Sequence, residues 1–207
     1  MSGKRARSEE AMGRVLGAAL ELFSSQGFRG TTMRQVAEAA GLSLGNVYHH
    51  FPNKEALFER LIERFFDRLV DPELPMNVIA LQGGFPDDLE AVATAIEQEV
   101  RASREYILLI YVDVIEFQGE HIQAFYREMA GRFDEVYGPL LAERQKRGEL
   151  GEADPVLSVM AIWRWLFHFF TVEVCFGASG HLGMEPDEAV REFLKLVRLG
   201  VLPRRSA

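Results

Sequence analysis

The strongest constraint on the fold of this chain is a pair of short helical segments near its N-terminus, separated by a turn of only a few residues. Thr31 and Thr32 provide hydroxyl groups that can cap the first segment, and Gly41 interrupts it. Ser43 is placed to cap the second segment, which ends near Phe51. Two short helices joined by a tight turn are typical of a helix-turn-helix.

Apolar residues recur at helical spacing along the rest of the chain, and no sustained period-two alternation interrupts them. Proline and glycine mark a loop over residues 72–86 and a kink at Gly138-Pro139. The fold is therefore predicted to be all-α with about nine helices, in an N-terminal three-helix helix-turn-helix domain, residues 1–53, and a helical domain, residues 54–207. Besides the short pair, the expected helices span residues 8–26, 54–69, 87–103, 106–117, 120–147, 155–176 and 186–201.

Charge is distributed unevenly along the chain, whose net charge is −8. Residues 1–54 hold seven lysines and arginines against four acidic residues, a net charge of +3, so residues 55–207 carry −11. A basic N-terminal region on an acidic protein is expected where only one end approaches a polyanion. Lys4, Arg5 and Arg7 form a basic arm that either lies in a minor groove or stays solvated.

The cysteine content and the apolar segments indicate the cellular compartment in which the protein is expected. Cys175 is the only cysteine, which excludes an intrachain disulfide and leaves a symmetric disulfide between two copies open. The charged N-terminus has no apolar signal region, so we expect a cytoplasmic protein. Residues 155–176 are almost long enough to span a bilayer, but Arg164, His168 and Glu173 interrupt them, at about 2.5 to 3.5 kcal/mol for a charge at mid-membrane. We interpret this segment as a buried helix at a subunit interface.

One continuous segment carries a specific motif: residues 27–58 read GFRGTTMRQVAEAAGLSLGNVYHHFPNKEALF. This segment closely resembles the DNA-binding signature of the tetracycline-repressor (TetR/AcrR) family and departs from it at no position. The resemblance implies a homodimeric transcription regulator, expected to be a repressor that a small hydrophobic or aromatic effector releases from a palindromic operator. It also implies that residues 54–207 form a ligand-binding and dimerisation domain.

The positions of this motif also have physical interpretations. Ala37 and Gly41 are small, which suits a close crossing of two short helices. Gly45 lies early on an exposed helix and costs about 1 kcal/mol relative to alanine, so we expect DNA to approach its backbone. The small core that holds the helix crossing is expected to contain Val36, Leu42, Val47 and Phe51.

By the same resemblance, residues 44–50 form the recognition helix, whose N-terminal residues meet base edges in the major groove. Asn46 is the best candidate for reading a base, because its amide can pair bidentately with adenine, although it can instead be a capping partner for Ser43. The two adjacent histidines could suggest a metal, but no third ligand is near them in sequence. The expected DNA contacts, including phosphate sites at helix N-termini, are Thr31, Thr32, Arg34, Ser43, Leu44, Gly45, Asn46, Tyr48, His49, His50 and Lys54.

The resemblance further places an effector cavity among the middle helices and a four-helix bundle of two subunits at the end of the chain. The helix 54–69 is expected to tilt when the effector binds. Candidate effector contacts are Glu99, Arg104, Tyr111, Val114, Phe117, Phe125, Met129, Phe133, Trp163, Phe167 and His168, with Asp113 and Arg164 as further polar anchors. Candidate dimer contacts are Val159, Trp163, Leu166, Phe170, Val174, Val190, Phe193, Leu194 and Val197, in a stripe that Leu202 extends.

Two other classes of function share features with this sequence. An enzyme could use the carboxylates of Asp113, Glu116 and Glu120, which fall near one helical face, but we interpret that face as solvated because no Glu-x-x-His, HExxH, GxSxG or Walker sequence is present. The other alternative is a ligand-independent accessory or architectural DNA-binding factor with the same fold. We expect neither catalysis nor a cofactor nor a metal.

Overall fold

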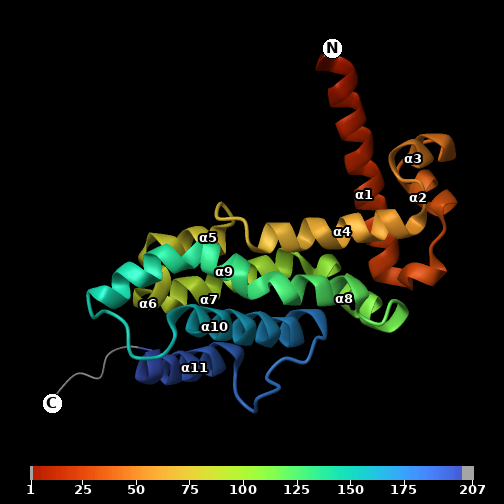
Figure 1. Ribbon diagram of the computed structural model, residues 1–207. Coiled ribbons are helices and arrows are strands. Elements are labelled where there is room, and N and C mark those ends of the chain that lie inside the picture. Colours follow the sequence, from red (N-terminus) through yellow and green to blue (C-terminus); the bar gives the residue numbers. More distant parts are fainter. Residues whose placement is uncertain (1, 202–207) are drawn as a thin grey trace. The chain divides into compact units, whose positions relative to one another are not determined.

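Figure 1 shows a computed structural model, which describes residues 2–201 of the chain. Over these residues the backbone forms eleven α-helices and two π-helical turns, without a strand, so the all-α prediction is confirmed and the number of helices exceeds nine. The helices are α1 (Ser2–Gly30), α2 (Met33–Ala39), α3 (Leu44–His50), α4 (Lys54–Leu69), α5 (Pro75–Ile79), α6 (Phe85–Asp87), α7 (Leu89–Ala102), α8 (Arg104–Glu116), α9 (Glu120–Lys146), α10 (Pro155–Phe170) and α11 (Pro186–Val201). The π-helical turns are η1 (Ala80–Gly84) and η2 (Thr171–Cys175).

The extra helices lie in the segment that was predicted to be a loop, residues 72–86. This segment forms α5, η1 and α6. Pro75 occupies the first turn of α5, where a missing backbone N–H breaks no helical hydrogen bond, so proline begins a helix here instead of ending one. Met76 and Phe85 are buried, which gives this segment a core-facing side. At Pro139 the helical conformation of α9 continues through the proline.

The helix-turn-helix forms through local hydrogen bonds that the sequence predicts. Thr32 caps α2 by accepting from the backbone N–H of Gln35, whose side chain in turn accepts from the N–H of Thr32. Ser43 Oγ accepts from the N–H of Asn46 at the start of α3. Gly41 has φ +64, and a Cβ there would meet only the Arg14 guanidinium at 3.8 Å. The expectation that Gly41 allows close helix crossing is therefore wrong, because its left-handed backbone after α2 is what requires glycine.

The chain forms two compact units. The head unit combines the residues up to Asp67 with Glu105–Phe125, and the body unit combines Arg68–Arg104 with the residues from Tyr126 onward. This division differs from the domain boundary expected after residue 53. In the head unit Phe58 of α4 stacks on Phe117, the residue after α8, and Phe65 of α4 stacks on Tyr106 of α8.

The head unit is built around the apolar face of α1 and the short helices that pack on it. Val36, Val47 and Phe51 are buried as predicted, whereas Leu42 is only half-buried. α1 begins at Ser2, earlier than expected, and leaves the helical conformation at Gly27, where φ is 80° and ψ is 168°. The other buried side chains of α1 and α4 include Val15, Ala19, Phe23, Leu57, Phe58, Leu61 and Phe65.

The body unit packs α10 along α7, with α11 against both (Figure 1). The segment Pro155–Cys175 is long and apolar enough to cross a membrane by length and composition, with a mean hydropathy of 1.3. Val159, Leu166 and Phe169 of that segment are buried inside the protein, as expected of a core helix. Leu202, the end of the predicted apolar stripe, lies outside the described residues.

Polar groups buried in the body unit find partners across it. Asn77 Nδ2 donates to the backbone carbonyls of Leu69 and Asp71, and its Oδ1 accepts from the Tyr137 hydroxyl. Burial raises the pKa of Tyr137, which keeps that hydroxyl a donor. Hydrogen bonds of this kind tie the start of α5 to the middle of α9.

Candidate DNA-binding site

The third helix divides its side chains between the core and solvent. Val47 is buried, while Leu44, Gly45, Tyr48 and His49 are exposed. A seven-residue helix that buries one side chain leaves most of its surface available to a partner.

Asn46 and the histidines of α3 retain side-chain groups for such a partner. Ser43 caps α3 by accepting from the backbone N–H of Asn46, so the side-chain amide of Asn46 is not used in that bond, and it makes no hydrogen bond to the described residues. His49 and His50 contact each other edge to face, with ring centroids 5.4 Å apart. Over the described residues no group of three histidine, cysteine or acidic side chains is placed to hold a metal ion.

Over the described residues, no contact or backbone angle requires glycine at position 45. A Cβ built at Gly45 meets nothing within 4 Å, and its φ is not in the left-handed region. Neither steric crowding nor backbone conformation within the described residues therefore explains this glycine, and close approach of DNA to its backbone stays a prediction.

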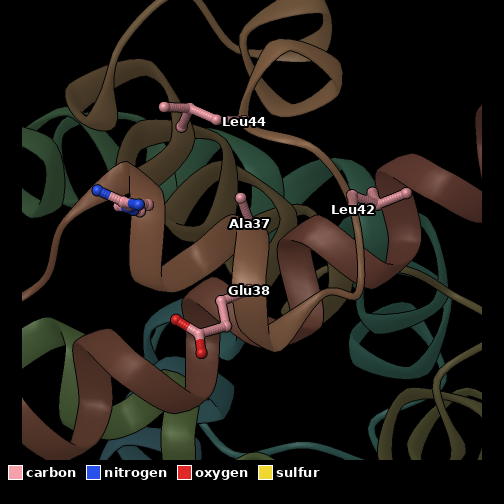
Figure 2. A pocket seen from close by; sticks show the side chains of 5 residues that line it. Ala37, Glu38, Leu42 and Leu44 are labelled. Carbon is pink, nitrogen blue, oxygen red and sulfur yellow. The ribbon is translucent and has the colours of Figure 1, made fainter.

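An open hollow of about 520 Å³ lies beside the turn between α2 and α3. Figure 2 shows Ala37 and Glu38 of α2 with Leu42 and Leu44 around it, and Arg34 completes the lining. Arg34 is exposed and has no ion-pair partner over the described residues. A free guanidinium next to the recognition helix is suited to bind a phosphate.

Two of the predicted phosphate contacts have other roles in the structure. Thr31 is fully buried, and its hydroxyl donates to the Gly27 carbonyl and accepts from Gln26, so the prediction is wrong for this side chain. Lys54 Nζ donates to the carbonyls of Phe28 and Thr31, at 2.7 and 2.9 Å. Only one of its three donors is left for DNA, whose contact with Lys54 stays a prediction.

The N-terminal basic residues are part of α1 and do not form an extended arm. Arg5 pairs with Glu9 one helical turn later, with both side chains exposed. A helix is too wide to lie in a minor groove as an extended arm would, so that alternative is wrong for the described residues.

The candidate effector contacts are divided between the two units. Tyr111, Val114, Phe117 and Phe125 belong to the head unit, and Phe117 packs among the rings of Phe28, Phe58 and His121. The members in the body unit are Glu99, Arg104, Met129, Phe133, Trp163, Phe167 and His168. Within the body unit Glu99 is buried and already accepts hydrogen bonds from Arg68 and Ser103. Its carboxylate serves the protein itself, and the effector contacts as a set stay a prediction.

The candidate dimer contacts are mostly turned inward. Six of them are buried within a single chain, namely Val159, Trp163, Leu166, Phe170, Leu194 and Val197, so the prediction that they face a partner is wrong. An apolar run on all sides of a helix does not reveal which face is internal. Val174, Val190 and Phe193 are half-buried, and Phe193 stacks on Trp165.

Two carboxylates that were interpreted as solvated are largely buried in the head unit. Asp113 has no exposed surface and accepts from the backbone N–H of Ile122, while its other oxygen lies 2.6 Å from His121 Nδ1. Glu116 binds backbone N–H groups near Gly27, and only Glu120 is exposed as expected. The partners of Glu116 lie 88 and 87 residues away, and those of Asp113 lie 8 and 9 residues away across the turn after α8. The helical pattern of the sequence indicated neither role.

Known proteins share this architecture and this motif. The family model of bacterial regulatory proteins of the tetR family matches residues 15–61. The transcriptional regulator RutR of Escherichia coli is 28% identical over 98% of this chain and 96% of that protein. The transcriptional repressor KstR2 of Rhodococcus jostii is 29% identical over 71% of this chain and 69% of that protein. The crystal structure of NalD, the secondary repressor of the MexAB-OprM multidrug efflux pump of Pseudomonas aeruginosa, has a TM-score of 0.61 at 22% identity, over 96% of this chain and 100% of that chain.

A helix-turn-helix that exposes α3 on a basic N-terminal region, attached to a larger helical body, defines a DNA-binding transcription regulator. The family match and the full-length relatives specify it further. Residues 15–61 match the N-terminal domain of the tetR family of bacterial regulatory proteins, and over nearly its full length the chain is similar to a transcriptional regulator.

Gly45 provides a test of how closely DNA approaches α3. Gly45→Ala is expected to stabilise the fold by up to about 1 kcal/mol and yet to weaken DNA binding, because the new methyl group points into space that DNA would occupy. Gly131→Ala in α9 is the matched control, since a Cβ at Gly131 also meets nothing within 4 Å. Urea unfolding measures stability, and a mobility-shift assay measures binding. Equal DNA affinity of the two variants would contradict close approach at Gly45.

Proposed function

We propose that this protein is a homodimeric transcription repressor, in which each subunit places α3 in the major groove of a two-fold symmetric operator. The observation that carries the proposal is the exposed face of α3 together with the unoccupied space at Gly45. The names of the full-length relative RutR, a transcriptional regulator, and of KstR2, a transcriptional repressor, support it. Repression is the direction we propose on those names.

In this proposal the side chains around α3 divide into two roles. Asn46 reads a base edge, because its amide is free and can donate and accept at the same adenine. Arg34, Tyr48, His49 and the hydroxyl of Thr32 position the protein on the phosphates. Leu44 adds an apolar contact, for which the methyl group of thymine is the chemical match.

The two roles predict different effects of substitution. Asn46→Ala is expected to relax specificity at one base pair, at about 1 to 3 kcal/mol, whereas Arg34→Ala is expected to weaken binding to all sequences and to reduce the salt slope of binding by about one. The operator is first selected from a random duplex library, and both variants are then titrated on it by fluorescence anisotropy at several salt concentrations. Failure of the wild-type protein to enrich any sequence would overturn the proposed function, and identical profiles for the two variants would overturn the division of roles.

We propose that the dimer uses the outer faces of α10 and α11. These faces carry large apolar side chains that the single chain leaves in solvent: Leu157 on α10, and on α11 Leu196 and Leu199, which are 68% and 78% exposed. Exposed leucines on two neighbouring helices form the kind of patch that a second subunit covers. Pairing also supplies the second recognition helix that a two-fold operator needs.

A charged substitution on the outer faces of α10 and α11 tests whether they form the dimer interface. Leu196→Glu is expected to convert the dimer to monomers, because a carboxylate buried in the interface loses its hydration without a partner. Ile115→Glu is the control, since Ile115 is 78% exposed but lies on α8. Light scattering after size-exclusion chromatography reports the mass. A dimer that survives Leu196→Glu, or that Ile115→Glu disrupts equally, would place the interface elsewhere.

We propose that an acyl or aromatic effector with a hydrogen-bond acceptor releases the operator by binding in the body unit. Trp163 supports this, because its Nε1 is buried and makes no hydrogen bond of good geometry over the described residues, although it interacts with the neighbouring Tyr137 hydroxyl. The indole lies edge to face with Phe85 and Tyr137, at centroid distances of 6.3 and 5.7 Å. A buried donor among aromatic rings suits a ligand that brings both a flat apolar part and an oxygen.

The effector proposal predicts a difference between the two tryptophans of α10. Trp163→Phe keeps the ring but removes the N–H, so it should weaken effector binding about 3- to 10-fold. Trp165→Phe is the control, because Trp165 stacks on Phe169 and Phe193. Thermal-shift screening with acyl, aromatic and strongly polar compounds identifies binders, and release is then measured on the selected operator. If no compound binds or releases DNA, the ligand-independent accessory factor becomes the better account.

A further inference from the structure

Glu116, the last residue of α8, holds the backbone of the final residues of α1, which follow the kink at Gly27 and lead into α2. Its Oε1 accepts from the backbone N–H of Phe28 and its Oε2 from that of Arg29, both at 2.8 Å. The side chain is 14% exposed, and Arg29 Nε lies 3.7 Å from Oε2. A carboxylate that receives two backbone N–H groups in a largely buried site forms strong, charge-assisted hydrogen bonds.

Gly27 is adapted to this contact in two ways. Its φ of 80° and ψ of 168° belong to a region that only glycine adopts readily. A Cβ at this position would also lie 2.8 Å from Glu116 Oε1, too close for any real contact. The backbone therefore turns at Gly27 so that the next two N–H groups face the carboxylate.

The same segment, Gly27–Thr31, is held from its other side by α4. Lys54 donates to the carbonyls of Phe28 and Thr31, and its ammonium lies 4.1 Å from the centre of the Phe28 ring. That ring packs against Phe58 and Phe117. The carboxylate of Glu116, which accepts from the N–H groups, and the ammonium of Lys54, which donates to the carbonyls, thus restrain the five residues that lead into α2.

The end of α8 is itself well anchored within the head unit. The Asp113 carbonyl accepts from the N–H groups of Phe117 and Gly119, and the Asp113 side chain binds His121 and the N–H of Ile122. These bonds close the turn between α8 and α9, where Gln118 and Gly119 have positive φ. Glu116 therefore projects from a turn that has little freedom to follow the segment if the segment moves.

We propose that Glu116 is a positioning residue for DNA binding, which holds Gly27–Thr31 in the conformation that presents α2 and α3 to the operator. The proposal rests on the proposed DNA-binding function. Without the two hydrogen bonds, the helix-turn-helix spends less time in the binding-competent orientation, and apparent affinity falls by the same fraction.

The charge of Glu116 alone predicts that its removal changes operator affinity in the opposite direction. Glu116 is an acid in the unit that binds a polyanion, so its neutralisation should leave DNA affinity unchanged or raise it slightly. Loss of positioning should lower affinity for the operator in spite of the gained charge. The sign of the change separates the two effects.

The experiment compares Glu116→Gln and Glu116→Ala with Glu105→Gln, an exposed acid at the start of the same helix. On the operator selected from the duplex library, Glu116→Ala is expected to bind about tenfold more weakly than wild type. Glu116→Gln keeps one acceptor oxygen, so its operator affinity should lie between those of wild type and Glu116→Ala. Glu105→Gln should match or slightly exceed wild type, and binding to a random duplex should not weaken in any variant.

Hydrogen exchange of individual amides distinguishes a local loss of restraint from a general loss of stability. In the Glu116 variants the amides of Phe28 and Arg29 should exchange faster, while those of α10 keep their wild-type rates. Glu116→Gln that binds operator as tightly as Glu105→Gln, or leaves exchange at Phe28 and Arg29 unchanged, would overturn the inference. A wild-type protein that selects no operator would instead overturn the proposed function, and the exchange measurement would still decide whether Glu116 restrains the segment.

Discussion

The interaction on which the head unit depends is the packing of Phe28, Phe58 and Phe117. Phe58 and Phe117 stack with ring centroids 4.8 Å apart, and Phe28 meets Phe117 edge to face at 4.6 Å. The three rings come from the segment before α2, from α4 and from the residue after α8, so one contact joins parts of the chain about 90 residues apart. Aromatic pairs of this geometry contribute about 0.5 to 1.5 kcal/mol beyond the burial of their area. The polar contacts of Glu116 and Lys54 with the same segment have a defined geometry because these rings hold the backbone near them.

The sequence predicted the helix-turn-helix well because its determinants are local. Thr32 and Ser43 cap the helices that they were expected to cap, and Gly41 ends α2. Each of these effects involves residues no more than a few positions apart, so the pattern alone defines them. The reason assigned to Gly41 was wrong, since spacing shows where a glycine stands but not whether sterics or backbone angle requires it.

Local sequence patterns do not predict contacts between residues that are far apart in the sequence. Thr31 was expected at a surface and is buried, and its hydroxyl bonds with Gln26 and with the carbonyl of Gly27, at the kink inside α1. Glu116 was interpreted as solvated, and its partners lie 88 and 87 residues away. In α10, apolar residues on every side concealed which face packs internally, so Val159 and Leu166 were assigned to a partner that they do not reach. Periodicity identifies a helix but gives its orientation only when one side is polar.

The placement of the two tryptophans has a practical consequence. Trp163 and Trp165 are the only tryptophans of the chain, and both lie on α10 in the body unit. Intrinsic indole emission is thus an optical label confined to one unit, while far-ultraviolet circular dichroism reports the helices of both. Denaturant titrations followed by the two signals coincide if the units melt together and separate if the head melts first.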